Sequence, residues 1–381
     1  MRKMIFLLLF LNFCATLFAQ QGKEILYVGT FSVRDSEGIY VFQFDRRQGT
    51  LQLLQAVKTI ESPSFLAIHP SGKFLYSVNR GNIPEQKKSG SVSAYAIDQS
   101  SGMLTLLNHK PSYGSGPCHI SIDQTGSLTF VSNYTEGTLT VLRLNNDGSL
   151  GELADSIRYF GSSVNKERQD KPHIHSATPS PDNRFVFVAD LGTDRVYAYK
   201  FDINTGKLKP AAKAFVELKP GTGPRHFTFH PNGKYAYVAE ELSSSVGVLS
   251  YESGNGTLTV IDDRVTSLPH DFKGNNTSAD IHTDPSGKFL MLSNRGHDAL
   301  AMFKIDDKGK LKQIGNQSTP GKRPRNFLID HNNQYIFVAH QDTDNIVVFH
   351  WDPKNGKLTD SGVQEKVPSP VCLKMVTLGK K

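Results

Sequence analysis

Residues 63–80 read PSFLAIHPSGKFLYSVNR: a short apolar run, a turn containing Pro70 and Gly72, and a β-rich run ending in Asn79 and Arg80. The same pattern returns along the chain, with copies that start at residues 63, 117, 174, 224, 278 and 324 and an incomplete copy at 370. A repeat of about 50 residues is typical of folds in which each copy forms one supersecondary unit. We therefore interpret the chain as seven copies of one unit.

Each copy predicts four short strands, here called A to D. In one copy strand A covers residues 227–229, a turn with Pro231 and Gly233 follows, and strand B covers 235–239. Strand C is expected at 196–201 in the preceding copy, with a short strand D at 207–208. No long helical pattern interrupts the series. Four strands per repeat of this length indicate a β-propeller.

The two ends of the chain decide the number of blades. Residues 25–51 supply strands B, C and D without an A, and residues 371–376 supply an A alone. Together they complete a seventh blade and close the ring, which removes exposed sheet edges. The sequence therefore predicts an all-β fold: a single seven-bladed propeller over residues 20–381, with four antiparallel strands in each blade.

The first 19 residues have the composition of a secretory signal peptide. Arg2 and Lys3 precede an apolar stretch from Ile5 to Phe18, and Ala19 offers a small residue for cleavage. The stretch is too short for a typical spanning helix, and no later segment is long and apolar enough to span a bilayer. We expect an exported protein, periplasmic or secreted, without a membrane span after cleavage. It would be cytoplasmic only if this segment were not a working signal.

Composition limits the class of partner. Apolar residues make up 38% of the 381, enough for a substantial core, and 43 Lys and Arg against 36 Asp and Glu leave a net charge of +7. No long basic cluster is present, which argues against a nucleic-acid partner but tolerates an anionic small molecule. Cys118 and Cys372 fall two blades apart, so we expect two buried free thiols.

Polar residues gather at one predicted face. In an antiparallel blade strand A starts where strand B ends, so both sets of residues lie at the same end of the central channel, together with the long loops. We call this end the polar mouth. Charged groups rarely gather near a propeller axis unless they are paired or functional. The candidates are His119, His173, His175, Arg225, His226, Asp280 and Arg325 near the starts of A, and Asn133, Glu241, Arg295 and His340 near the ends of B.

Several of these residues also have structural interpretations. His119 and His226 could bridge neighbouring blades, and Asn133 could cap the turn between strands B and C. His173 and His175 resemble a metal pair, but no third ligand follows at suitable spacing, so we expect no metal. The chain has no Gly-x-Ser-x-Gly elbow, no Gly-rich phosphate loop and no dinucleotide fingerprint.

Five segments carry a family resemblance: 223–238, beginning GPRHFTFHPNG, then 241–242, 279–290, 293–298 and 324–327. They resemble the seven-bladed lactonase family of propeller-type 6-phosphogluconolactonases and carboxymuconate-cyclising enzymes. The resemblance extends over nearly the whole chain after the signal peptide. Two departures are Asp280, where the family often has Glu, and Glu240, where it often has Asn.

The resemblance implies hydrolysis of an intramolecular ester, with His175, Arg225, Glu241 and Arg295 on the family's proposed active-site positions. His175 would act as general base, and Glu241 would orient it or serve as the base itself. Arg225 and Arg295 would bind the carbonyl oxygen and an acidic group of a sugar lactone. The remaining mouth candidates would contact the substrate, and no cofactor is required. The oligomeric state is not predicted.

A second hypothesis remains, a non-catalytic propeller that binds a carbohydrate or protein partner in the cell envelope. The two hypotheses predict different mouths. Convergence of Arg225, Arg295, His175 and Glu241 favours hydrolysis, whereas a flat face rimmed by Tyr134 and Phe31 favours binding.

Overall fold

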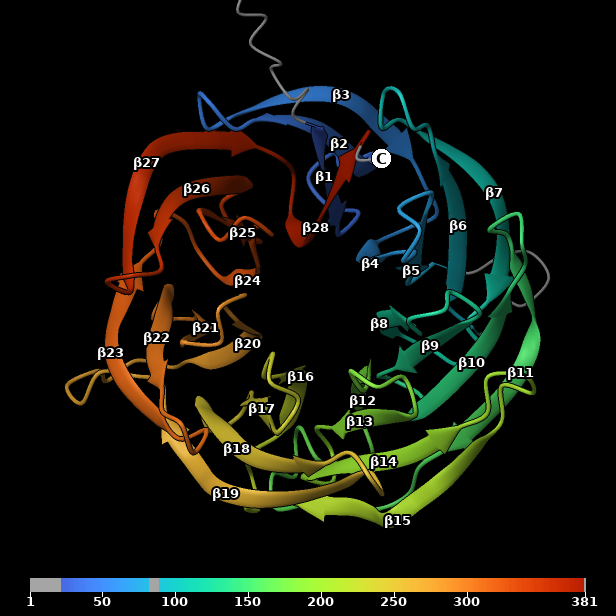
Figure 1. Cartoon of the computed structure of the whole chain (residues 1–381), viewed down its shortest axis with the longest axis vertical. Helices are drawn as coiled ribbons and strands as arrows, with labels where there is room; N and C mark the ends of the chain where they lie inside the picture. The colour runs from blue at the N-terminus through green and yellow to red at the C-terminus, as the bar shows by residue number, and fades with distance from the viewer. Residues whose placement is uncertain (1–21, 82–88, 380–381) are drawn as a thin grey trace, which may run out of the picture.

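The chain forms a ring of seven four-stranded antiparallel sheets around a central channel (Figure 1). The computed structural model describes residues 22–81 and 89–379, and within these ranges there are 28 strands and no helix. The seven-bladed, all-β prediction is confirmed. The predicted signal peptide lies outside the described residues. None of the described residues forms a helix long and apolar enough to cross a membrane.

Each blade places its strands in order from the channel to the rim. The innermost strands are β28 (Pro370–Leu378), β4 (Pro63–Ile68), β8 (Pro117–Ile122), β12 (Ile174–Pro179), β16 (Pro224–Phe229), β20 (Thr277–Thr283) and β24 (Pro324–Ile329). The second strands are β1 (Lys23–Thr30), β5 (Phe74–Asn79), β9 (Leu128–Asn133), β13 (Phe185–Asp190), β17 (Tyr235–Glu240), β21 (Phe289–Arg295) and β25 (Tyr335–His340).

The outer half of each blade follows in the same order. The third strands are β2 (Gly38–Asp45), β6 (Ser91–Ile97), β10 (Thr138–Leu144), β14 (Arg195–Phe201), β18 (Ser245–Glu252), β22 (Ala299–Ile305) and β26 (Asn345–Asp352). The outermost are β3 (Thr50–Lys58), β7 (Leu104–Pro111), β11 (Leu150–Arg158), β15 (Leu208–Glu217), β19 (Thr257–Thr266), β23 (Leu311–Ser318) and β27 (Lys357–Lys366).

The expectation of a short outermost strand at 207–208 is wrong, because β15 runs for ten residues. Its side chains are mostly exposed or half-buried, so apolar alternation is weak along it. A register shift against β14 between Tyr197 and Tyr199 further breaks the periodicity. The outer strands therefore lack the period-two signal that marks the buried strands.

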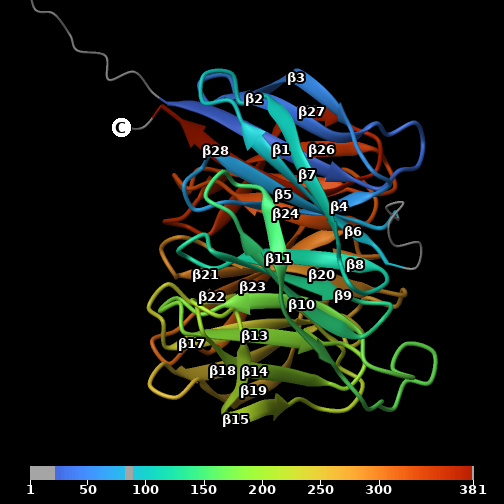
Figure 2. The ribbon, with the colours of Figure 1, turned by 90° about the vertical axis from the view of Figure 1, so that its right-hand side faces the viewer.

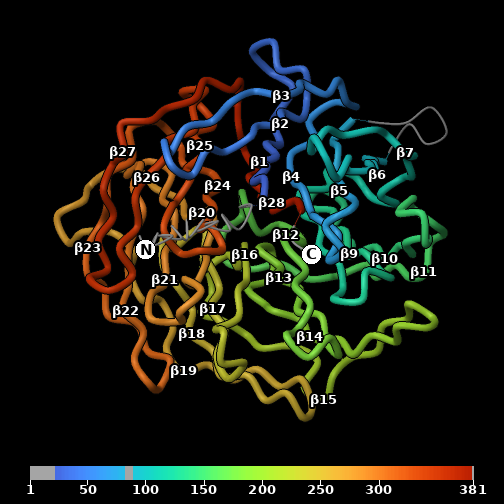
Figure 3. Tube along the Cα trace, turned by 45° about the horizontal axis from the view of Figure 1, so that its top comes forward, coloured from blue at the N-terminus to red at the C-terminus, as the bar shows by residue number. Residues whose placement is uncertain are grey.

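The ring closes as predicted, with β28 pairing antiparallel to β1 over its whole length (Figure 3). Figure 2 shows from the side that the blades pack face against face. Between blades the packing is apolar and is locked in part by tyrosines of the second strands. The hydroxyls of Tyr27, Tyr76 and Tyr237 donate to the carbonyls of Gly102, Gly148 and Gly309 in the next blade. This repeated contact sets the inner strands at fixed spacing around the channel.

Candidate active site

The inner strands are irregular where they begin. In all seven blades the register between the innermost and second strands shifts at this point. The residues left without a ladder partner include Cys118, His175, Arg225 and Arg325. A bulge re-aims side chains, and bulges are common next to active sites. The shift lets two consecutive residues at a strand start, such as Arg225 and His226, both reach toward the channel.

Glu241, which directly follows β17, is the centre of the polar mouth. Its side chain is buried, and its Oε1 accepts a hydrogen bond from Arg168 Nη2 at 2.8 Å. Its Oε2 lies 2.9 Å from Arg225 Nε and 3.2 Å from Arg295 Nη2. Burial alone would raise the pKa of Glu241, but the three guanidiniums outweigh it and lower this pKa to about 2. The carboxylate is therefore ionised at neutral pH and is a poor proton acceptor.

His175 lies beside this carboxylate in a different protonation state. Its Nε2 is 3.8 Å from Glu241 Oε2. Burial, followed by the neighbouring Arg225 guanidinium, holds the pKa of His175 well below its ordinary value. The imidazole is therefore neutral at pH 7, with one ring nitrogen unprotonated. Its Nδ1 lies 3.8 Å from Cys118 Sγ.

Two more arginines stand at the mouth without a carboxylate. The guanidiniums of Arg80 and Arg325 lie 4.7 and 5.1 Å from the centre of the Phe31 ring. Arg325 Nη1 donates to the amide oxygen of Gln341 at 3.2 Å. Burial, with Arg225 nearby, holds the pKa of Arg325 well below its ordinary value. Within the described ranges, neither Arg80 nor Arg325 forms an ion pair.

Some buried guanidinium donors have no acceptor. Arg225 Nε and Arg295 Nε are both without a hydrogen-bond partner among the described residues. The 2.9 Å contact of Arg225 Nε with Glu241 is thus an ion pair whose N–H is not directed at the carboxylate oxygen. Buried donors of this kind call for an explanation, and an oxygen of a bound ligand would satisfy them. The mouth can therefore receive a small molecule that presents oxygen atoms or negative charge.

The comparisons with known proteins decide the family. The model of the seven-bladed β-propeller lactonase family matches residues 25–375. The chain belongs to this family. Its predicted resemblance is confirmed, and so is the prediction that it is an enzyme of the carboxylic ester hydrolase class.

The similarity between this lactonase and its relatives extends over almost the whole chain. A Formosa agariphila protein named 6-phosphogluconolactonase is 38% identical, with 92% of this chain and 99% of the relative covered. A Bacillus subtilis protein of the same name is 36% identical, with coverage of 93% and 99%. The solved structure of a Pseudomonas aeruginosa periplasmic gluconolactonase superposes with a TM-score of 0.86 at 31% identity, covering 94% of this chain and all of that one.

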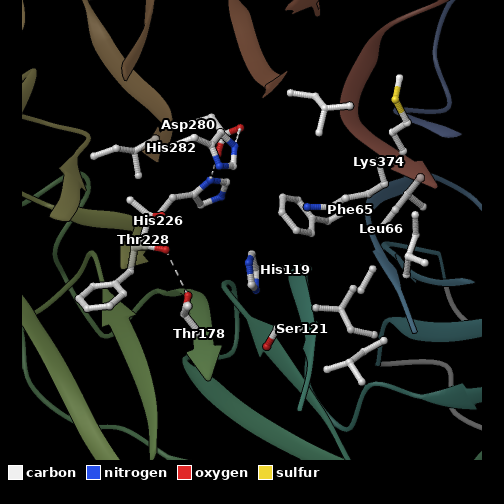
Figure 4. Close-up of a pocket in the computed structure, with 18 residues that line it drawn as sticks. Phe65, Leu66, His119, Ser121, Thr178, His226, Thr228, Asp280, His282 and Lys374 are labelled. Carbon is white, nitrogen blue, oxygen red and sulfur yellow. Dashed lines mark hydrogen bonds and ion pairs between the residues drawn. The ribbon is translucent and has the colours of Figure 1, made fainter. Parts of the chain in front are cut away.

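Three other predicted residues line the channel beneath the arginines of this lactonase. His119, His226 and Asp280 face a cavity of about 400 Å³ that extends toward the opposite end (Figure 4). The rings of Phe65, His119 and His226 pack against one another, with centroids 4.4 to 5.6 Å apart. This aromatic layer forms the floor of the mouth. The cavity below it has Lys374 on one wall and Ser121 and Thr178 on another.

The remaining predicted residues make contacts within loops and blades. His173 stacks on Tyr134, with ring centroids 4.4 Å apart, and its Nδ1 is 3.0 Å from the Tyr134 carbonyl. Asn133 is fully buried and donates to the Thr138 hydroxyl and the Ser112 carbonyl, while its Oδ1 has no partner among the described residues. His340 is also fully buried, and neither of its ring nitrogens has a described partner.

Sequence reasoning missed Arg168 as a site residue, and it did not predict that Arg80 and Phe31 would come together at the mouth. Arg168 lies in the long loop between β11 and β12, where no repeat position marks it. Arg80 and Phe31 each follow the end of a second strand, and every blade has such a position. The two residues come together only because the ring closes. The two described cysteines, Cys118 and Cys372, are buried free thiols as predicted.

Proposed function

We propose that this enzyme hydrolyses a sugar-derived lactone at the polar mouth. The observation that carries the proposal is the pair of buried Arg225 and Arg295 Nε–H donors that have no acceptor in the described parts of the chain, next to a neutral His175. Lactone opening needs an activated water and a stabilised carbonyl oxygen, and these groups supply both. The names of the relatives from Formosa agariphila and Bacillus subtilis support the same reaction class.

In the proposed reaction His175 removes a proton from water as the water oxygen attacks the lactone carbonyl carbon. The carbonyl oxygen becomes an oxyanion that faces Arg225 and Arg295. Collapse of the intermediate breaks the bond between the carbonyl carbon and the ring oxygen. The proton returns from His175 to that ring oxygen, which leaves as an alcohol, and the product is a hydroxy acid. Glu241, ionised and 3.8 Å from His175, stabilises the imidazolium that forms in between.

The charge of the mouth favours a substrate with an anionic group. Arg80 and Arg325 add two guanidiniums that form no ion pair with a described carboxylate. A phosphate or carboxylate is the natural partner of paired guanidiniums. We therefore expect kcat/KM to be higher for 6-phosphogluconolactone than for neutral gluconolactone, and we expect Arg325→Gln to reduce this preference about tenfold.

The alternative, non-catalytic binding at an aromatic face, is less well supported. Tyr134 is stacked on His173, and Phe31 lies against Arg80 and Arg325. These rings are part of the polar cluster and do not form an open rim.

The proposed site is tested with His175→Ala and Arg225→Ala. Each should abolish turnover while leaving the circular dichroism spectrum unchanged. The matched control is His331→Ala, which removes an exposed histidine in the turn between β24 and β25. It should retain full activity. Unchanged turnover in both site variants would remove the assignment.

We further propose that the enzyme is exported and meets its lactone outside the cytoplasm. The basic and apolar N-terminal residues support this, and the Pseudomonas aeruginosa relative is titled periplasmic. N-terminal sequencing of the protein from a cell-envelope fraction should give a start near Gln20. A protein that retains Met1 in the cytoplasm would contradict export.

A further inference from the structure

A chain of three buried side chains runs from the floor of the mouth to Arg225. Asp280 Oδ1 is 2.6 Å from His226 Nδ1, and His226 Nε2 is 3.1 Å from Arg225 Nη1 (Figure 4 shows the first of these contacts). Arg225, His226 and Asp280 are 2%, 6% and 2% exposed. A guanidinium only donates hydrogen bonds, so His226 Nε2 is the acceptor and His226 Nδ1–H donates to Asp280. Asp280 therefore selects the tautomer of His226 that Arg225 needs.

Asp280 is itself held firmly. Its Oδ2 accepts hydrogen bonds from His282 Nε2 at 2.9 Å, from the Asn326 amide, and from the Phe327 backbone N–H at 3.2 Å. Burial alone would raise its pKa, but His282 and the hydrogen bond from His226 keep it well below its ordinary value. Asp280 is thus an ionised carboxylate held between β20 and β24, so the oxygen that accepts a hydrogen bond from His226 has a fixed position.

The other contacts of Arg225 complete its orientation. Its Nη1 also donates to the Ala279 carbonyl at 2.5 Å, while its Nε forms an ion pair with Glu241 Oε2 at 2.9 Å without a hydrogen bond. His226 and Ala279 thus hold the Nη1 side of the guanidinium, and Arg225 Nε–H has no acceptor among the described residues. Without His226 as acceptor, the guanidinium could rotate about its terminal torsions and lose this alignment.

We propose that Asp280 is a positioning residue, which acts through His226 to orient Arg225 toward the lactone carbonyl. This inference rests on the proposed lactone hydrolysis and replaces the expectation that Asp280 and His226 contact the substrate. A hydrogen bond that fixes a group in contact with the substrate contributes to catalysis through geometry. Its loss therefore reduces transition-state stabilisation more than ground-state binding.

The test compares Asp280→Asn and His226→Phe with His331→Ala, the control variant of the proposed site. The first two break the branch that leads to Arg225, whereas His331, in the turn between β24 and β25, contacts Glu24 and Thr377 and no member of this branch. We expect kcat to fall about 10- to 100-fold in Asp280→Asn and His226→Phe, with KM changed less than threefold. His331→Ala should stay within twofold of wild type. Asp280→Glu, which keeps the charge, should restore much of kcat.

The outcomes separate this inference from the proposed function. A wild-type enzyme that hydrolyses no lactone overturns both. An active wild type with kcat unchanged in Asp280→Asn and His226→Phe overturns the positioning role alone, as does a rise in KM at constant kcat, which would make Asp280 a substrate contact. Should Asp280→Asn fail to fold, His226→Phe carries the test, because it keeps an aromatic ring against Phe65 and His119.

Discussion

Glu240 allows a stability prediction that runs against the usual effect of pH on a carboxyl group. It ends β17, at the repeat position that holds Asn79, Asn133 and Asn294 in other blades. It is fully buried, its Oε2 accepts from the Ser245 hydroxyl, and its Oε1 has no described partner. Burial raises the pKa of Glu240 from 4.5 to about 8, against a smaller opposing effect of the Ser245 hydrogen bond.

The size of the effect follows from this shift. Below pH 4.5 Glu240 is protonated in both the folded and unfolded states, and its contribution to stability is fully present. As the pH rises from 4.5 to 8 the unfolded chain ionises and the folded one does not, so stability falls by about 1.4 kcal/mol per pH unit. The loss over this interval is about 5 kcal/mol. Glu240→Gln stays neutral and should be more stable than wild type by about 3 kcal/mol at pH 7.

The assay is urea unfolding of wild type and Glu240→Gln at pH 5, 7 and 8.5, with the difference in unfolding free energy as the readout. Taking the difference cancels the titration of the groups that do not interact with Glu240, which leaves Asp263 and Arg264 as its charged neighbours. Glu252→Gln, which removes an exposed carboxylate on β18, is the control and should show no trend. A Glu240→Gln difference that stays constant or shrinks as pH rises would refute the reasoning.

Three further predictions concern the site and the thiols. Arg168→Gln should lower kcat/KM about tenfold while changing the unfolding free energy by less than about 1 kcal/mol, because the Arg168 side chain is 38% exposed; a large loss of stability in urea would contradict this. Since the pKa of His175 lies well below its ordinary value, kcat/KM should stay level from pH 8 to 6, and a drop centred near 6.5 would count against a neutral His175. Cys118 and Cys372, buried and with pKa raised to about 11, should react with a disulfide reagent only after denaturation, and rapid reaction of the native protein would exclude that burial.

The fold could be predicted because each blade repeats one local pattern. The buried strands carry strong apolar runs, and the incomplete first and last copies could only pair with each other, as β1 and β28 do. The length of the outermost strands could not be predicted, because strands such as β15 face solvent and have no steady alternation.

The site was only partly predictable for a different reason. Antiparallel pairing places the starts of the A strands and the ends of the B strands at one end of the channel, which gave eleven mouth candidates. The family resemblance then singled out His175, Arg225, Glu241 and Arg295 among them. The register shifts that give two channel-facing residues per strand leave no mark in the sequence. Because of this shift, Arg225 lies at the mouth and the next residue, His226, lies in its floor. The repeat positions alone do not predict this difference. Arg168 reaches Glu241 from a loop, and loops carry no period.

The central claim is that Arg225 and His175 act together at the mouth to open a lactone. The most direct measurement is proton release by the purified enzyme on sugar lactones with and without a phosphate, relative to the spontaneous rate, beside Arg225→Ala and His331→Ala. We predict acceleration by wild type and His331→Ala, and its loss in Arg225→Ala. The claim would be contradicted if Arg225→Ala still accelerated hydrolysis. It would also be contradicted if the wild-type enzyme accelerated the hydrolysis of no lactone.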